Sequence, residues 1–225
     1  MQIQSVNNTP AFQANHLRTA VKLAQNAGQH KAAIDIYSIN KSDSEFINKL
    51  LLKLDLKDRA DGTAVKEKRN INDTIRSVLT KALHLDEKSN DGVYMAVENG
   101  KRISGFLDYT NGGMPLIKSL VSWRGKEKNN VRMNLFSEFL HKVGIPSGED
   151  IAVYAEPKSK GHKWLLEQGF TIPAQPAFTR QRLVMPQEAV IANTAKSDRL
   201  LEDNAGMKIT QNSERTHIEL TNFEL

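Results

Sequence analysis

Residues 116–123 read LIKSLVSW, an apolar run with the composition of a β-strand, and residues 124–130 read RGKEKNN, a basic polar loop. Apolar residues then recur at helical spacing, which predicts an amphipathic helix carrying Val131, Leu135, Phe136, Phe139, Leu140 and Val143. A second strand, IAVYA at 151–155, and a short helix that ends in Gln168-Gly169-Phe170 complete the stretch. This order of strand, loop, helix, strand and helix decides the fold.

The start of the first helix in this stretch predicts an anion site. The first N–H groups of a helix have no partner within it, and the helix dipole favours negative charge there. A basic loop leading into such a helix brings free donors and positive charge together, and a diphosphate is the ligand this arrangement favours. The loop alone also fits an alternative, a basic surface loop in front of an ordinary core helix.

The first half of the chain predicts a strand and two helices. Residues 33–39 read as the strand. Ser42 and Glu45 form a capping box for the first helix, whose apolar face carries Phe46, Ile47, Leu50, Leu51 and Leu54. A charged loop at 57–70 then leads to a second helix at about 72–85.

A hairpin and a last strand complete the pattern. Residues 93–97 and 102–107 flank Asn99-Gly100, and Asn-Gly between two apolar runs is a strong signal for a two-residue turn. Residues 178–184, bounded by prolines, read as the last strand.

Taken together, these elements resemble the GNAT-type N-acetyltransferases, from about residue 31 to residue 185. The segment HKWLLEQGF at 162–170 is similar to the closing segment of that family. The resemblance implies an α+β fold with a mixed, mostly antiparallel sheet of six to seven strands and helices on both faces. It also implies that the strands at 116–122 and 151–155 splay apart.

The resemblance implies acetyl-CoA as the cofactor, with its pyrophosphate on the loop and the start of the helix. The family loop reads Gln/Arg-x-x-Gly-x-Gly/Ala. If Leu135 and Phe136 are the apolar pair that follows it, Glu127, Asn130 and Arg132 occupy the motif positions and both glycines are replaced. Alternatively, Arg124-Gly125-Lys126 begins a motif about three residues longer. The residues that resemble the cofactor-binding segment are Val121, Ser122, Arg124, Gly125, Lys126, Lys128, Asn129, Asn130, Val131 and Arg132.

The resemblance also implies transfer of the acetyl group to an amine, carried by a small molecule or a protein. The tyrosine that often protonates the leaving thiolate in the family is Leu165 here. Tyr154 and Glu156 are the candidate catalytic residues, and Asp108 is a further carboxylate within reach of such a site. In the alternative without a catalytic role, Tyr154 is a half-buried packing residue, and Glu156 and Asp108 are solvated loop carboxylates.

Composition excludes several other classes. The chain has 225 residues, 39% hydrophobic and 25% charged, and no cysteine, so disulfides and thiolate metal sites are excluded. No apolar run reaches the roughly 18 residues of a membrane span, and the first residues do not resemble a secretory signal. No metal-ligand spacing occurs among the six histidines. We therefore expect a cytoplasmic protein without a metal.

Three segments organise the chain in this interpretation. Residues 1–30 form a partly disordered extension, with disorder at 1–14 and a helix at 16–27. Residues 31–185 form the GNAT-like domain. Residues 186–225 form an extension of unknown role: a lid, a dimerisation arm or, by default, a flexible tail, with a helical part at 187–204 and a hairpin of 207–209 with 216–220.

Three functions remain open at this level. The first is an N-acetyltransferase. The protein is also a possible homodimer. The second is a catalytically inert binding module of the same fold, favoured by the replaced glycines and by Leu165. The third, nucleic-acid binding through the basic loop, is disfavoured because only Trp123 lies among those charges as a stacking platform.

Overall fold

The computed structural model describes residues 12–23, 30–60, 66–123, 128–173, 180–204, 206–211 and 215–218. One sheet runs through the molecule in the order β7-β6-β5-β4-β3-β2-β1-β8, and a ninth strand, β9, also pairs with β1. The sheet is mixed and mostly antiparallel, since only the β5–β6 pair is parallel. The predicted fold class is therefore confirmed, with more strands than the six or seven expected. The strands are β1 (Phe12–Leu23), β2 (His30–Ile39), β3 (Gly92–Glu98), β4 (Arg102–Thr110), β5 (Leu116–Ser122), β6 (Ile151–Ala155), β7 (Gln181–Met185), β8 (Met207–Gln211) and β9 (Arg215–Ile218).

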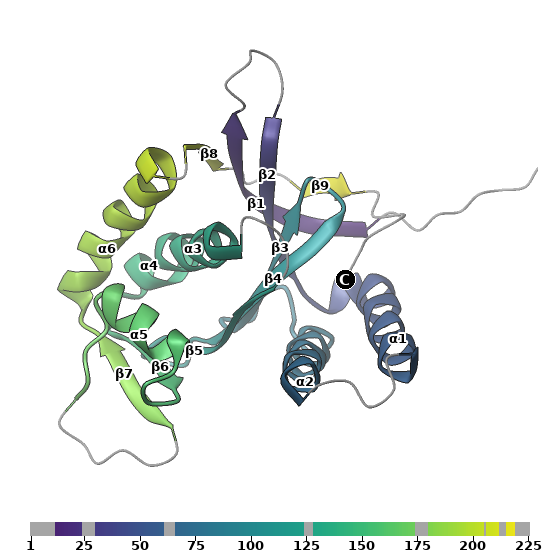
Figure 1. Ribbon diagram of the computed structural model, residues 1–225, viewed down its shortest axis with the longest axis horizontal. Helices are drawn as coiled ribbons and strands as arrows, with labels where there is room; N and C mark the ends of the chain where they lie inside the picture. Colours follow the sequence, from purple (N-terminus) through teal and green to yellow (C-terminus); the bar gives the residue numbers. More distant parts are fainter. Residues whose placement is uncertain are drawn as a thin grey trace, which may run out of the picture.

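Helices cover both faces of this sheet (Figure 1). α1 (Ser44–Ala60) and α2 (Lys66–Ala82) lie on one side, whereas α3 (Lys128–Phe139), α5 (Lys160–Glu167) and α6 (Gln187–Arg199) lie on the other. π-helical turns extend α3 over Leu140–Gly144 and α6 over Leu200–Asn204, and α4 (Ile145–Ser147) follows the first of them. None of the described helices is both long and apolar enough to cross a membrane.

Two apolar cores lie on the two faces of the sheet. The core beneath α3 includes Phe136, Phe139 and Leu183, and the core beneath α1 and α2 includes Leu50, Leu79 and Phe106. The strands between them are buried on both sides, so β3 is buried at every position from Gly92 to Glu98. The two helical layers thus enclose the middle of the sheet.

The Asn99-Gly100 hairpin forms as predicted. Both residues have positive φ, 53° at Asn99 and 66° at Gly100. A two-residue turn with positive φ at both positions matches the right-handed twist of the strands it joins, and asparagine and glycine adopt that conformation most readily. This local geometry sets the register of β3 on β4.

The helix predicted at 16–27 is wrong in its described part, because residues 12–23 form the strand β1. Side-chain burial alternates along it, with His16, Arg18 and Ala20 buried and the residues between them partly exposed. β1 lies between β2 on one side and β8 with β9 on the other. Pairing on both sides stabilises extended backbone, which outweighs the helical spacing of Leu17 and Val21.

Within the C-terminal extension, the predicted hairpin is also wrong. β8 and β9 both pair with β1, in succession along its length, instead of with each other. α6 covers the predicted helical part of the tail and packs against α3 and the turn that follows it. The described residues of this extension are therefore ordered elements of the fold instead of a flexible tail.

Three local boundaries differ from the predictions. The capping box before α1 is formed by Asn40 and Asp43 in place of Ser42 and Glu45, with an intervening turn of 3-10 helix. α1 runs on to Ala60 and α2 begins at Lys66, so most of the predicted loop at 57–70 is helical. The strand predicted at 178–184 is β7 at 181–185, and its predicted start lies outside the described residues.

Candidate functional site

The parallel strands β5 and β6 separate soon after they meet. Their register contains two pairs, Leu116↔Ala152 and Ile117↔Val153, and no further pair follows within the described parts of these strands. The register of β4 on β5 also shifts between Asp108 and Tyr109, which leaves Lys118 as an extra residue in β5. Such bulges re-aim side chains and interrupt pairing beside functional sites. The predicted splay is thus present and begins at Lys118.

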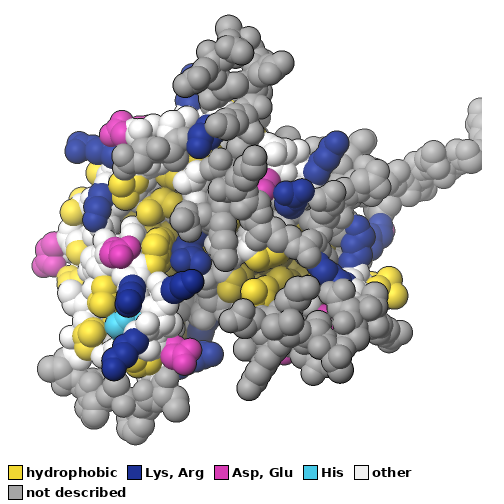
Figure 2. All heavy atoms as spheres, viewed as in Figure 1, with side chains coloured by type: hydrophobic (Ala, Val, Ile, Leu, Met, Phe, Trp, Pro, Cys, Tyr) yellow, Lys and Arg dark blue, Asp and Glu magenta, His cyan; other side chains and the backbone are white. Residues whose placement is uncertain are grey.

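A cavity of about 210 Å³ lies where the two strands separate. Residues of β5, β6, α5 and the first turns of α3 contribute to its lining. Its lining combines two cationic side chains, two aromatic rings and one carboxylate: Lys118, Leu120, Arg132, Val153, Tyr154, Ala155, Glu156, Ser159, Gly161, Trp164 and Leu165. Lys and Arg side chains gather on the surface over α5 and the adjoining end of α3 (Figure 2).

Arg132 brings a partly desolvated positive charge to this cavity. Its guanidinium lies over the ring of Trp164, 5.4 Å from the ring centre, in a cation–π contact. Nε of Arg132 is buried and has no hydrogen-bond partner among the described residues. Burial lowers the pKa of Arg132, because it removes water from the charged form. An oxyanion ligand would supply an acceptor for Nε of Arg132 and a negative charge next to its guanidinium.

The first turn of α3 lies close to the sheet because of Gly105 on β4. A Cβ at this position would lie 2.7 Å from the carbonyl oxygen of Val121 and 2.9 Å from a methyl carbon of Val131. Glycine therefore permits the close approach of the helix start to β5. The backbone N–H groups at that helix start are the donors on which the predicted anion site depends.

The predicted cofactor-binding residues divide into four groups. Arg132 lines the cavity, whereas Val131 is buried in the core. Lys128 and Asn129 open α3, and Asn130 accepts a hydrogen bond from the Asn134 amide at its carbonyl. Val121 and Ser122 end β5, with the Ser122 hydroxyl buried and without a hydrogen-bond partner among the described residues. Arg124, Gly125 and Lys126 lie outside the described residues.

Both candidate catalytic residues line the cavity. Tyr154 on β6 is 49% exposed, and Glu156 is exposed just beyond the end of that strand. Leu165 occupies the position of the family tyrosine and lines the same space. Tyr154 is therefore about half exposed and does not belong to either described core.

Asp108 has a different environment from the one expected. It is 7% exposed, and its carboxylate accepts a hydrogen bond from Lys81 of α2, which also donates to the carbonyl of Tyr109. Burial raises the pKa of Asp108, and the hydrogen bond and charge of Lys81 oppose that rise. Asp108 is therefore a buried ion-pair partner rather than a solvated loop carboxylate.

Sequence reasoning missed two side chains of the cavity, Trp164 and Lys118. The closing segment at 162–170 contains Trp164, but its orientation toward α3 depends on how α5 packs. No part of the described chain holds three His, Asp or Glu side chains that could bind a metal ion together.

Comparisons with solved structures place this architecture among acetyltransferases of the GNAT family. Apo FdhC, a nucleotide-linked sugar GNAT, aligns with a TM-score of 0.51 and 12% identity over 75% of this chain and 94% of its own. An aminoglycoside 6′-acetyltransferase type Ii aligns with a TM-score of 0.49 and 13% identity over 68% and 96% of the two chains. The PaiA N-acetyltransferase from Thermoplasma acidophilum, solved in complex with coenzyme A, gives 0.42 and 12% over 68% and 98%.

No protein-family model and no curated protein matches the sequence. At identities this low, the structural likeness shows the fold alone. The chain has the GNAT acetyltransferase fold, as the order of its elements predicted, in a divergent sequence.

Proposed function

We propose that this protein is an N-acetyltransferase that binds acetyl-coenzyme A and transfers its acetyl group to an amine. The observation that carries the proposal is the cavity between β5 and β6, whose lining includes Arg132 of α3, Tyr154 and Glu156. One space therefore brings together a cation that can bind an anion and groups for proton transfer. A donor with phosphates at one end and a reactive thioester at the other fits that arrangement.

The phosphate end would be held by α3 and the residues before it. Free N–H groups at the start of the helix and the guanidinium of Arg132 both suit a diphosphate. The pantetheine arm contains amide groups, and beyond Ile117↔Val153 the two strands have no further ladder pair in the described residues. Backbone groups that face the gap can therefore pair with those amides, as strands do when they accept an extended ligand.

The reaction end needs little beyond proximity and two proton transfers. The acceptor nitrogen attacks the thioester carbonyl carbon, so that a C–N bond forms, the C–S bond breaks, the nitrogen loses a proton and the sulfur gains one. In this proposal Glu156 accepts the proton from the nitrogen, directly or through water, and the hydroxyl of Tyr154 donates one to the sulfur. The strands and α5 hold the reactants in place, which supplies most of the rate.

A calorimetric titration and a steady-state assay test this proposal. We expect acetyl-coenzyme A to bind and to raise the melting temperature, because a ligand of the folded state stabilises it. Tyr154→Phe and Glu156→Gln should each lower kcat by about 10² while the dissociation constant of coenzyme A stays near that of the wild type. Glu149→Gln, an exposed carboxylate outside the cavity, is the matched control and should leave both quantities unchanged.

A catalytically inert binding module of the same fold is the second candidate. Two replacements favour it: Leu165 at the position of the family tyrosine, and Arg132 at a glycine position of the loop. The two functions differ in one outcome. If coenzyme A binds but no amine in a broad panel is acetylated above the uncatalysed rate, the inert module is correct and the acetyltransferase is not.

A further inference from the structure

Three side chains form a row across the splayed half of the sheet, on the face opposite α3. Successive side chains of a strand point to opposite faces. Val153 and Leu183 belong to the core beneath α3, so their neighbours Tyr154 and Arg182 point the other way. Lys118 is the extra residue of the β5 bulge, and its charge acts on Asp108, whose carboxylate is held by Lys81 of α2 on that opposite face. The register supports the row, because Tyr154 pairs with Arg182 and Lys118 follows the last β5–β6 pair.

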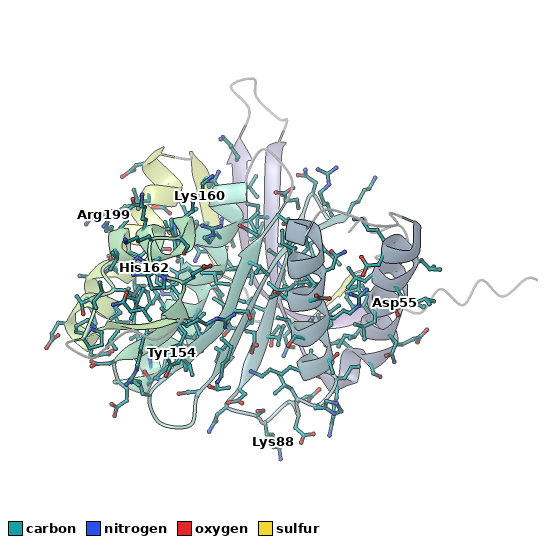
Figure 3. The ribbon with its side chains drawn as sticks, turned by 60° about the horizontal axis from the view of Figure 1, so that its bottom comes forward. Asp55, Lys88, Tyr154, Lys160, His162 and Arg199 are labelled. Carbon is teal, nitrogen blue, oxygen red and sulfur yellow. The ribbon has the colours of Figure 1, made fainter. Side chains whose placement is uncertain are left out.

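The helices of that face leave this part of the sheet open. The core beneath α1 and α2 contains residues of β2, β3 and β4 with Val121 of β5, and the described residues of β6 and β7 contribute nothing to it. Tyr154 lies on the half of the sheet away from α1 and α2 (Figure 3). Lys118 is exposed and Arg182 is partly exposed, and Lys118 shares the cavity with Tyr154. The row is therefore accessible at the point where the donor's reactive end would lie.

The two cations of the row have no carboxylate partner among the described residues. No ion pair joins either of them to an Asp or Glu there, and the contact of Arg182 is to the sulfur of Met114 at 3.4 Å. Asp108, an acidic group on the neighbouring strand β4, is held by Lys81 of α2. Glu156 lies at the end of β6 in the same cavity. The charge of Lys118 also acts on Asp108, without an ion pair between them. The open face thus presents two cations outside any ion pair of the described residues and, beside them, one carboxylate.

We infer that the acceptor is a small amine that carries an oxyanion, a carboxylate or a phosphate. The oxyanion binds Lys118 and Arg182 over the ring of Tyr154, and the amine faces Glu156. Tyr154 and Arg182 are paired on neighbouring strands about 4.8 Å apart, whereas β5 separates from β6 at Lys118, and the long side chains of Lys118 and Arg182 reach across this opening to one anion. This inference rests on the proposed acetyl transfer, and it adds the class of the acceptor.

Pairs of acceptors that differ by one anionic group test the inference. Lysine and cadaverine differ by a carboxylate, and O-phosphoethanolamine and ethanolamine differ by a phosphate. We expect the anionic member of at least one pair to have about tenfold higher kcat/KM with acetyl-coenzyme A. The pair that responds distinguishes a carboxylate site from a phosphate site. Equal or lower kcat/KM for the anionic members would overturn the inference while leaving acetyl transfer intact.

Variants that remove one positive charge test whether Lys118 and Arg182 bind the anion of the acceptor. Lys118→Gln and Arg182→Gln should each lower about tenfold the ratio of kcat/KM for the acceptor that carries the anion to kcat/KM for the analogue that lacks it. Lys88→Gln and Arg199→Gln are matched controls at exposed positions away from the row (Figure 3). An equal loss of activity toward both members of a pair, or an equal loss in the controls, would contradict a role in anion recognition.

A binding measurement keeps this inference separate from the proposed function. NMR titrations of the protein, with and without coenzyme A, compare O-phosphoethanolamine with ethanolamine. Selective binding of the phosphorylated amine that is lost in Lys118→Gln supports the anion site even if no acetyl transfer is found. If neither anionic amine binds more tightly than its analogue, the inference fails, whatever the result for the coenzyme.

Discussion

Arg18 and Asp198, 180 residues apart in the sequence, form an ion pair at 3.0 Å that joins β1 to α6. The side chain of Arg18 is fully buried, and its second nitrogen donates to the hydroxyl of Ser137 on α3 at 2.6 Å. Ser137 in turn donates to Asp198, and His141 contacts the other carboxylate oxygen at 2.6 Å. The N-terminal strand and the C-terminal helix are thereby tied to α3, the helix that carries Arg132.

Replacing Asp198 should destabilise the protein strongly. Asp198→Asn would leave Glu138, at 4.0 Å, as the remaining carboxylate partner of the buried Arg18 guanidinium. Removing one partner of a fully buried ion pair destabilises by about 3 to 5 kcal/mol. Because Asp198 is partly exposed and Glu138 remains, we expect a loss of about 2 kcal/mol. Chemical denaturation would measure the change in the free energy of unfolding. Asp203→Asn, an exposed carboxylate just beyond α6, is the control and should change it by less than about 0.5 kcal/mol. An effect of that small size in Asp198→Asn would contradict a stabilising role for the pair.

The hydrogen bonds and charges around Asp198 also predict how the free energy of unfolding depends on pH. Burial raises the pKa of Asp198, but the hydrogen bonds from His141 and Ser137 and the charge of Arg18 outweigh it and lower the pKa from 3.8 to about 2. Because the folded state binds this proton less readily than the unfolded state, the contribution is complete above about pH 5. It is lost as the pH falls from about 4 to about 2.

A pH series of denaturation curves checks that dependence. The contribution amounts to roughly 2 kcal/mol for a pKa shift of this size. The wild-type protein should therefore lose more stability between pH 5 and pH 3 than Asp198→Asn does. Parallel pH curves for the two proteins would show that Asp198 does not titrate in the way proposed.

A substitution at Gly105 should weaken both the packing of α3 on the sheet and the binding of the coenzyme. A Cβ at this position would meet the backbone of β5 and the side chains of α3, so Gly105→Ala must push the helix start away from the strand. Overpacking of this kind destabilises by about 1 to 3 kcal/mol. We expect a lower melting temperature and weaker coenzyme binding, measured by calorimetry. Gly112→Ala is the matched control, because a Cβ there meets no atom within 4 Å; an equal effect in both variants would remove the packing explanation.

Reversing charge in the basic loop should separate a coenzyme-binding protein from a nucleic-acid-binding one. Lys126→Glu with Lys128→Glu should weaken coenzyme binding, because both positions lie beside the predicted phosphate site. Lys88→Glu with Lys101→Glu changes the net charge equally at exposed positions elsewhere and should not weaken it.

The salt dependence of DNA binding completes that comparison. A dedicated DNA-binding protein loses affinity with a log–log slope of about −0.9 per phosphate contacted. We expect weak DNA binding that disappears at moderate salt. Submicromolar DNA affinity at physiological salt, with no response to coenzyme A, would show that the loop serves nucleic acid instead.

The sequence predicted the elements whose conformation is decided locally. Asn99-Gly100 specifies its own turn, so the hairpin of β3 and β4 could be located from the order of residues alone. Residues 116–122 and 151–155 are apolar runs bounded by polar segments, and their strands end where the runs end. The family resemblance makes Tyr154, Glu156 and Arg132 candidates, and all three line one cavity.

Only the tertiary structure decided the rest, because the information lies in contacts between distant segments. Residues 12–23 form a strand since β2, β8 and β9 supply its backbone partners, and nothing within the segment itself specifies them. Lys118 and Arg182 share an open face with Tyr154 because of the register between three strands. The sequence by itself predicted the strand at 116–122 and the helix after it, whose start is the proposed anion site. Pairing across the sheet decided which charges lie together, since a shift of one residue in register moves every side chain of a strand to the other face.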